Sequence, residues 1–238
     1  MKPASRAIDV KESIWSENEA RSAALRASLR ARGVLMVDLM GSPGSGKTSL
    51  LLETLKRLPP GLRAAVVEGD LESTTDADIV NGAGWDAVQI RTGGYCHLDA
   101  AMVASALEVL GFGPDGMADG EAPYDVVFVE NIGNLVCTAQ SDVGAHLRVA
   151  HLSRPEGDDK PVKYPMMFRN SDAVVLTKAD YGDLAPFDVA AVRDRVRFLN
   201  PMAAVFDTSC RSGAGLDEWA AFLAARLREC RLPEGAPS

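Results

Sequence analysis

The chain contains few cysteines and histidines, four and three respectively in 238 residues. Four cysteines without the spacing of a disulfide framework, in a chain of this length, argue against a small secreted scaffold. Aromatic residues account for only 6%, but hydrophobic residues account for 47% and charged residues for 24%, which is the composition of a globular protein. The sequence therefore predicts a folded protein with reduced thiols.

Long apolar runs and basic runs are also missing. No stretch approaches the roughly 20 apolar residues that a membrane-spanning helix needs, and the opening residues MKPASRAIDVKES lack the apolar core of a signal peptide. The net charge is −8, and the arginines of residues 21–33 alternate with Ala and Leu, as on a solvated helix. We expect a cytoplasmic protein that binds neither nucleic acid nor a membrane, and whose partners are proteins, small molecules or metal ions.

Apolar segments of strand length alternate with amphipathic segments of helical length. This order predicts an α/β fold, a mainly parallel sheet with helices on both faces. We expect residues 1–33 to form an N-terminal helical segment packed on the main domain, residues 34–232 to form that domain, and residues 233–238 to form a frayed tail. Residues 111–123 are rich in Gly and Pro, and residues 151–168 are polar with three prolines, so both are predicted as loops, the second an extended surface loop.

A glycine-rich stretch, GSPGSGKT, follows the first predicted strand and precedes a helix. This is the phosphate-binding P-loop pattern in the context that supports it. Backbone N–H groups would cradle phosphate, Lys47 would neutralise the β- and γ-phosphates, and the Thr48 hydroxyl would bind Mg²⁺. The predicted phosphate-binding residues are Gly41, Ser42, Pro43, Gly44, Ser45, Gly46, Lys47, Thr48 and Ser49.

Carboxylates end two of the other predicted strands. Glu68 and Asp70 close one strand, and Glu130 closes another, with Gly133 placed to contact a γ-phosphate. Because a buried acid at a strand end is costly unless it is paired or binds a cation, we predict Glu68, Asp70 and Glu130 as Mg²⁺ ligands with Thr48. Lys47, Asp70 and Glu130 are the predicted catalytic groups.

The stretch LTKAD, after another predicted strand, is similar to the guanine-recognition motif N-K-x-D. Asp180 would accept hydrogen bonds from guanine N1–H and its 2-amino group, which adenine cannot supply. Lys178 would lie along the base, and Thr177 stands where Asn is usual. After the last strand, Ser209 and Cys210 would form the tip of a loop that closes over the base.

Cys96 and His97 are neighbours in a predicted turn, and Cys137 follows a second strand-end turn. Two thiolates and one imidazole suit Zn²⁺ or Ni²⁺, and the missing fourth ligand indicates an open position or one shared across a dimer. From the residues alone, two alternatives stay open, namely buried small residues and a nucleophile with its base.

These stretches, in order, closely resemble the nickel–iron hydrogenase maturation GTPases of the HypB family. The resemblance spans about Asn18 to Asp180 and includes QIRTGGYCHLDA, VVFVENIGNLVC and EGDDKPVKYPMMF. It implies a P-loop GTPase related to urease and cobalamin metallochaperones, which dimerises with nucleotide and assists nickel delivery, with maturation proteins and the hydrogenase large-subunit precursor as partners. A urease-type accessory GTPase matches mainly the nucleotide motifs.

The resemblance implies that Cys96, His97 and Cys137 bind metal at the interface of two GTPase domains. It also implies that Lys160 reaches the partner's nucleotide. Because the first 95 residues contain no Cys and no His, we expect no N-terminal nickel motif of the kind that many members carry.

The sequence thus predicts a GTP-hydrolysing metallochaperone in which GTP and Mg²⁺ order the loops after Glu68 and Glu130. We expect Cys96 and Cys137 to follow neighbouring strand ends, so the same movement would open the metal site. No obvious water-positioning Gln or arginine finger is present, so slow intrinsic turnover is expected. A small-molecule P-loop kinase is disfavoured by Asp180, and a non-catalytic scaffold by the intact P-loop and Glu130.

Overall fold

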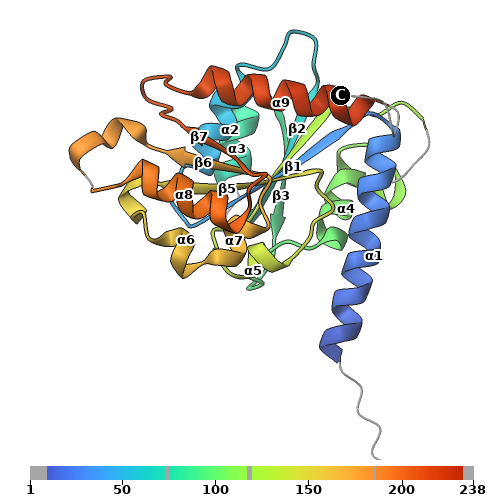
Figure 1. Ribbon diagram of the computed structural model, residues 1–238. Coiled ribbons are helices and arrows are strands. Elements are labelled where there is room, and N and C mark those ends of the chain that lie inside the picture. Colours follow the sequence, from blue (N-terminus) through green and yellow to red (C-terminus); the bar gives the residue numbers. More distant parts are fainter. Residues whose placement is uncertain (1–9, 73–74, 117–119, 185, 233–238) are drawn as a thin grey trace, which may run out of the picture.

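A seven-stranded, all-parallel sheet forms the centre of the protein (Figure 1). The computed structural model describes residues 10–72, 75–116, 120–184 and 186–232. The strand order is β3-β2-β4-β1-β5-β6-β7. The strands are β1 (Leu35–Gly41), β2 (Ala64–Asp70), β3 (Asp86–Arg91), β4 (Val126–Glu130), β5 (Leu147–Ser153), β6 (Ala173–Thr177) and β7 (Ala204–Asp207). The predicted α/β class is confirmed.

Helices cover both faces of the sheet. One face packs against α2 (Lys47–Leu55), α3 (Thr75–Gly82) and α9 (Leu216–Arg231). The other face packs against α1 (Val10–Ala31), α4 (Ala100–Val109), α5 (Cys137–Gln140), α7 (Pro165–Arg169) and α8 (Val189–Leu199). The short α6 (Lys160–Lys163) and the 3₁₀ turns η1 (Pro114–Gly116), η2 (Arg154–Glu156) and η3 (Ala179–Leu184) complete the described elements.

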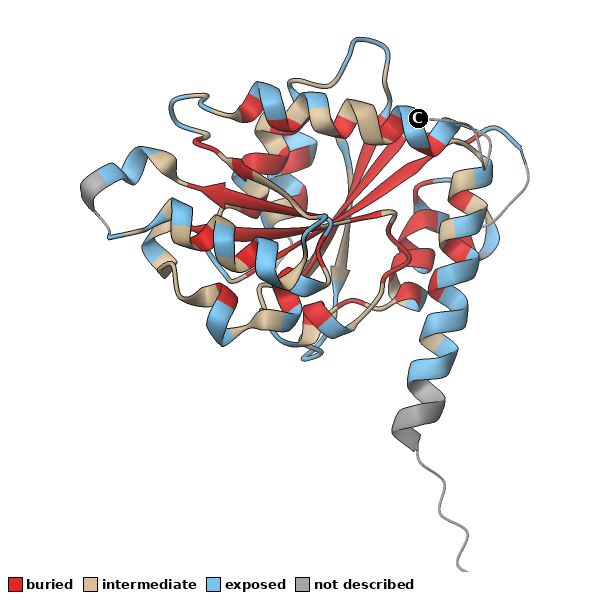
Figure 2. Cartoon of the chain, in the orientation of Figure 1, coloured by how far each residue is buried: buried red, intermediate tan, exposed pale blue. Residues whose placement is uncertain are grey.

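The central strands are buried on both faces, as Figure 2 shows by their red colour. All seven residues of β1 are buried, because apolar side chains alternate toward two different layers of helices. Leu35, Val37 and Leu39 join the core under α2 and α9, whereas Met36 and Met40 point to the opposite layer. A parallel strand inside such a fold therefore reads as a continuous apolar run, which explains why the sequence revealed it.

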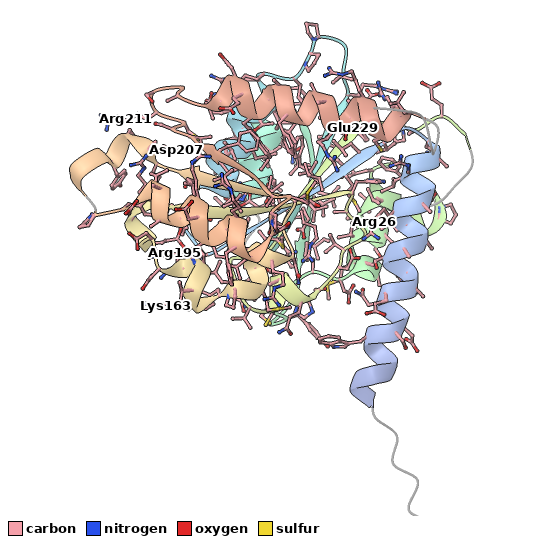
Figure 3. The ribbon with its side chains drawn as sticks, in the orientation of Figure 1. Arg26, Lys163, Arg195, Asp207, Arg211 and Glu229 are labelled. Atoms are coloured by element: carbon pink, nitrogen blue, oxygen red, sulfur yellow. The ribbon has the colours of Figure 1, made fainter. Side chains whose placement is uncertain are left out.

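The N-terminal helix α1 packs beside α4 at one side of the sheet (Figure 1). Leu25 and Leu29 are fully buried there, and Arg26, labelled in Figure 3, projects from α1 toward the body of the protein. Its guanidinium donates to the Ala145 carbonyl oxygen at 2.8 Å and pairs with Asp142 at 2.5 Å. Residues 1–9, the predicted tail 233–238 and part of the predicted 111–123 loop lie outside the described residues.

The extended surface loop predicted for residues 151–168 is wrong. His151–Ser153 ends the buried strand β5, and the rest of the segment folds into η2, α6 and α7, with Met167 and Phe168 fully buried. The sequence does not predict strand β5, because Arg148 and His151 interrupt its apolar pattern. Both polar groups are accommodated inside: the Arg148 guanidinium by backbone carbonyls and His151 Nδ1 by the carbonyl of Met40 at 3.1 Å.

No helix in the described ranges is long and apolar enough to cross a membrane.

Candidate functional site: a P-loop beside a thiol–imidazole cluster

The turn between β1 and α2 has the backbone that the P-loop pattern requires. Gly44 and Gly46 have positive φ angles of 74° and 92°, a region that favours glycine. At Gly41, an added Cβ would lie 2.9 Å from the carbonyl oxygen of His151 in β5. The loop delivers the chain into the first turn of α2, whose N–H groups have no acceptor within the helix. The turn is therefore built to bind an anion such as phosphate.

Lys47 and Thr48, at the start of α2, face the strand-end carboxyl of Glu130. Lys47 is 6% exposed, and its Nζ lies 4.0 Å from Glu130 Oε1 and 3.4 Å from the Ser42 carbonyl oxygen. The Thr48 hydroxyl donates to Glu130 Oε1 at 2.9 Å. Glu130 and Glu68 are register partners on the adjacent strands β4 and β2, so the two carboxyl groups stand side by side.

The electrostatics of Glu68 and Glu130 fit a divalent cation. Burial, with the Glu130 charge second, raises the pKa of Glu68 to about 9. Burial raises the pKa of Glu130 to about 7, although Lys47 and the Thr48 hydroxyl oppose it. Oε1 of Glu68 and Oε2 of Glu130 are buried without a hydrogen-bond partner. A Mg²⁺ ion prefers oxygen ligands, so it would satisfy both atoms and relieve the repulsion.

Asp70 lies at the end of β2, further toward solvent than Glu68. Its Oδ1 accepts the backbone N–H of Glu72 at 3.0 Å. The side chain is half-buried and stabilises the turn that follows the strand. Its predicted contribution to Mg²⁺ binding and catalysis stays a prediction.

The TKAD turn is tied directly to the P-loop. The buried Thr177 hydroxyl donates to the Ser45 carbonyl oxygen at 2.5 Å, and Lys178 Nζ donates to the Gly44 carbonyl oxygen at 2.7 Å. Lys178 has a φ of 61°, the one positive value at a non-glycine residue in the described chain. Thr177 thus uses its hydroxyl to support the P-loop, which would bind the phosphates of a nucleotide whose base lies beside TKAD.

The exposed Asp180 is oriented by the loop after β7. The Ser209 hydroxyl donates to Asp180 Oδ1 at 2.6 Å, and this hydrogen bond lowers the pKa of Asp180. Cys210 packs its side chain against the apolar core, and burial raises the pKa of its thiol. Of the two predicted tip residues, Ser209 therefore contacts the recognition carboxylate, and Cys210 anchors the loop.

Cys96, His97 and Cys137 come together in space. One potential ligand atom from each lies within 4.8 Å of the others, and all three residues are half-buried. Cys96 Sγ is 3.7 Å from His97 Nδ1, and the hydrogen bond with Cys96 is the main reason that the pKa of Cys137 is raised. Among the residues placed by the structure, this is the one cluster of at least three His, Cys, Asp or Glu side chains suited to a metal. It adjoins a cavity of about 300 Å³ toward α1.

The expectation that Cys96 and Cys137 follow neighbouring strands is wrong, because β2 lies between β3 and β4. The turn after β3 crosses the end of β2 instead. A Cβ at Gly69 of β2 would lie 2.8 Å from the Leu98 side chain, so glycine leaves room for the crossing. The Leu98 N–H then reaches Asn131 Oδ1, just after β4, at 3.1 Å.

Asn134 joins the thiol–imidazole cluster to the P-loop, and the sequence reasoning missed it. Its N–H donates to the Gly41 carbonyl oxygen at 3.0 Å, and its Oδ1 accepts the N–H groups of Val136 at 2.7 Å and Cys137 at 3.0 Å. An Asn shortly before a helix start is typical of such a turn, and this was the available signal.

Glu156 was also missed. It accepts hydrogen bonds from the Ser42 hydroxyl of the P-loop and from the Ser153 backbone N–H at 2.8 Å. The S-x-x-E spacing of Ser153 and Glu156 is a capping-box pattern that could have revealed the turn. Lys160, at the first position of α6, follows the same segment and is half-buried.

Phosphate loop, paired carboxyl groups and TKAD turn all lie at the carboxyl edge of one parallel sheet, where such folds bind nucleotides. This arrangement defines a P-loop nucleotide-hydrolysing protein. Comparison with known proteins agrees. Residues 35–207 match the family model described as CobW/HypB/UreG, nucleotide-binding domain.

The chain is 41% identical to the hydrogenase maturation factor HypB of Azotobacter chroococcum over 96% of its own length and 72% of that protein. It is 40% identical to HypB of Escherichia coli, over 90% of this chain and 71% of that protein. The hydrogenase/urease maturation factor HypB of Helicobacter pylori is 37% identical over 93% of this chain and 89% of that protein.

Among solved structures, HypB from Helicobacter pylori in complex with nickel superposes with a TM-score of 0.82 at 34% identity, over 93% of this chain and all of that one. HypB from Archaeoglobus fulgidus superposes with a TM-score of 0.79 at 32% identity, over 89% of this chain and 99% of that one. The signal recognition particle receptor FtsY from Elizabethkingia anophelis, at 14% identity, covers 92% of this chain and 75% of that one with a TM-score of 0.52, so it shares the fold alone. The chain belongs to the CobW/HypB/UreG family, among its HypB members.

Proposed function

We propose that this protein is a GTP-hydrolysing metallochaperone that assists nickel insertion during the maturation of nickel–iron hydrogenase. The observation that carries the proposal is the contact between its two sites. Asn134 binds the P-loop at Gly41 through its N–H and the backbone of Cys137 through its side chain. Through these two hydrogen bonds a change in the phosphate loop would reach a potential metal ligand. The hydrogenase maturation role comes from the names of the HypB relatives.

In the nucleotide site, residues 41–49 would cradle the phosphates and Lys47 would neutralise charge on the γ-phosphate. Thr48, Glu130 and Glu68 would hold Mg²⁺, and Asp70 is proposed as a further ligand. The ion would neutralise negative charge on the β- and γ-phosphates. Gly133 packs against the P-loop, where a Cβ would lie 2.7 Å from Pro43 Cγ, and its backbone would contact the γ-phosphate.

In the metal site, Cys96, His97 and Cys137 would bind Ni²⁺ or Zn²⁺, with the remaining coordination supplied by water or a second subunit. The nickel-bound Helicobacter pylori structure supports nickel as the cargo. A GTP-dependent homodimer, with Lys160 reaching the partner's nucleotide, would bring two such sites together. Maturation proteins and the hydrogenase large-subunit precursor are the expected further partners.

Guanine selection tests the nucleotide half of the proposal. In Asp180→Asn the carboxylate that would accept two guanine donors becomes an amide, so we expect GDP affinity to fall by about tenfold or more, the equivalent of losing a charge-assisted hydrogen bond. Xanthosine diphosphate, which carries an oxygen in place of the 2-amino group, should bind the variant better than it binds the wild type. Equilibrium binding of GDP, ADP and xanthosine diphosphate measures this.

Asp188→Asn is the matched control, because Asp188 is an exposed N-cap of α8 that accepts from the Ala191 N–H, and Asn caps helices equally well. Equal affinities for GDP and ADP in the wild type, or unchanged GDP affinity in Asp180→Asn, would contradict guanine recognition by TKAD.

Urease is the alternative recipient enzyme. The Helicobacter pylori relative, which this chain covers over 89% of its length, is named a hydrogenase/urease maturation factor. Nickel transfer from the purified protein to each apo-enzyme would decide between the two recipients.

A further inference from the structure

Asp38 is a charged residue in the middle of β1 for which the proposed reaction has no use. It is 0% exposed and lies between Met36 and Met40, on the sheet face covered by α1, α4 and α5. Burial raises the pKa of Asp38 to about 6, and Arg148 and Asn131 oppose that effect. A buried carboxyl group is costly unless its hydrogen bonds serve the structure around it, so its partners identify its role.

One partner leads to the loop that carries Cys96 and His97. Asp38 Oδ1 accepts from Asn131 Nδ2 at 3.1 Å. Asn131 Oδ1 in turn accepts the backbone N–H of Leu98 at 3.1 Å, and Leu98 directly follows His97. Asn131 is 1% exposed and Leu98 is fully buried, so no water competes for these bonds.

The other partner leads to the loop that carries Cys137. Asp38 and Arg148 are register partners on β1 and β5, and Asp38 Oδ2 lies 3.9 Å from Arg148 Nε as an ion pair. Arg148 Nη2 donates to the carbonyl oxygen of Thr138, which directly follows Cys137, at 2.8 Å, and to that of Ser141 at 3.0 Å. The guanidinium therefore fixes the short helix α5 at both ends.

A last hydrogen bond closes a ring between the two loops. The Ser141 hydroxyl donates to the Leu98 carbonyl oxygen at 2.8 Å. The Asp38 ring thus consists of Asp38, Asn131, Leu98, Ser141 and Arg148. Asn131 and Ser141 bind the N–H and the carbonyl oxygen of Leu98, and Arg148 binds carbonyl oxygens of α5 and Ser141. Asn131 and Arg148 both contact the buried carboxyl group of Asp38, so the ring supports the two loops that carry the Cys96–His97–Cys137 cluster.

We propose that Asp38 is a positioning residue of the metal site, which sets the separation of Cys137 from Cys96 and His97 through the two arms of this ring. The inference rests on the proposed function of the cluster as a metal site. Three protein ligands from two separate loops bind a metal tightly only if the loops are held in register before the metal arrives. The three ligand atoms lie within 4.8 Å of one another, and the ring holds the backbone next to His97 and next to Cys137.

Two variants open the ring at different points. In Asp38→Asn, the amide oxygen must still accept from Asn131, so the amide NH₂ faces the Arg148 guanidinium, and two donors oppose each other. Ser141→Ala removes the hydroxyl that closes the ring and leaves the buried charge intact. Asp125→Asn is the matched control, because Asp125 pairs with Arg231 at 2.5 Å, and it directly precedes β4, at the strand end away from the cluster.

The full-length metal-free protein is titrated with Ni²⁺ against a chromogenic chelator, and GDP affinity is measured on the same samples. We expect Ni²⁺ affinity to fall by about 10- to 100-fold in Asp38→Asn, as for residues that support metal ligands elsewhere, and by a smaller factor in Ser141→Ala. GDP affinity should stay within about twofold in both, and the sulfur-to-nickel charge-transfer absorption of the saturated variants should shift. Asp125→Asn should bind Ni²⁺ like the wild type.

Suppose that Ser141→Ala, and Asp38→Asn where that variant folds, bind Ni²⁺ through Cys96 with wild-type affinity. This result would overturn the positioning role of Asp38 and would leave the proposed metal site standing. A loss of Ni²⁺ affinity that Asp125→Asn shares would also overturn it, because the effect would then reflect general stability. Wild-type protein that binds Ni²⁺ no better than Cys96→Ala would overturn the metal site itself.

Discussion

His146 ties strand β1 to helix α1 through both of its ring nitrogens. Nδ1 accepts the backbone N–H of Met36 at 3.0 Å, which assigns the proton to Nε2, and Nε2 then donates to the Arg26 carbonyl oxygen at 3.0 Å. Burial lowers the pKa of His146 to about 4. Protonation would place a second proton on Nδ1, opposite the Met36 N–H, so the folded protein keeps the ring neutral.

The consequence for stability has a definite sign. As the pH falls below about 6.5, an unfolded histidine takes up a proton, whereas folded His146 stays neutral until about pH 4. The contribution of His146 to the free energy of unfolding is therefore complete above about pH 6.5 and is lost progressively down to about pH 4. At about 1.4 kcal/mol for each pH unit, the loss between about pH 7.5 and about pH 5 amounts to about 2 kcal/mol.

Urea denaturation of the wild type and of His146→Asn at these two pH values measures the effect. The Asn oxygen can still accept from Met36, but it does not titrate, so the variant should lose about 2 kcal/mol less than the wild type on acidification. Other titrating groups, such as the buried His151, act equally in both proteins and cancel in the comparison. An identical loss in both proteins would refute the reasoning.

Three further changes test the site and the core. Gly133→Ala places a Cβ 2.7 Å from both Cγ and the backbone nitrogen of Pro43, so the P-loop has to shift: GTP turnover, followed by phosphate release, should fall by about tenfold or more, and the thermal midpoint of the nucleotide-free protein should fall as well. Glu68→Gln removes a carboxyl group whose pKa burial raises to about 9; urea denaturation of the metal-free variant should show greater stability, and its Mg²⁺-dependent nucleotide binding should weaken. Trp219→Phe loses the buried bond from Nε1–H to the Thr54 hydroxyl at 2.9 Å, which should cost about 1–3 kcal/mol by the same denaturation measurement.

The parallel sheet and the P-loop were predictable because both are local patterns. A buried parallel strand is a continuous apolar run, and the glycines of residues 41–46 are imposed by the backbone itself. The meeting of Cys96, His97 and Cys137 followed from the family resemblance. Their spacing in the sequence left other interpretations open.

Strand order and buried polar groups were not predictable in the same way. No local sequence pattern indicates that β2 lies between β3 and β4, so the path of the Cys96 loop across Gly69 could not be predicted from the sequence. Strand β5 was not predicted because Arg148 and His151 look like surface residues until their partners, the carbonyl oxygens of Thr138 in α5 and of Met40 in β1, are known. The contacts of Asn134 with Gly41 and of Asp38 with Asn131 join distant segments, and only the folded chain shows them.

The central claim, a metal site whose state follows the nucleotide, is tested most directly by Ni²⁺ binding in three nucleotide states. Ni²⁺ stoichiometry and affinity are measured with a GTP analogue, with GDP and without nucleotide, in the wild type and in Cys96→Ala. The account predicts that wild-type affinity differs between the GTP-analogue and GDP states, because Asn134 connects Gly41 to Cys137, and that Cys96→Ala loses the site. Ni²⁺ binding that is identical in all three states, or unchanged in Cys96→Ala, would contradict it.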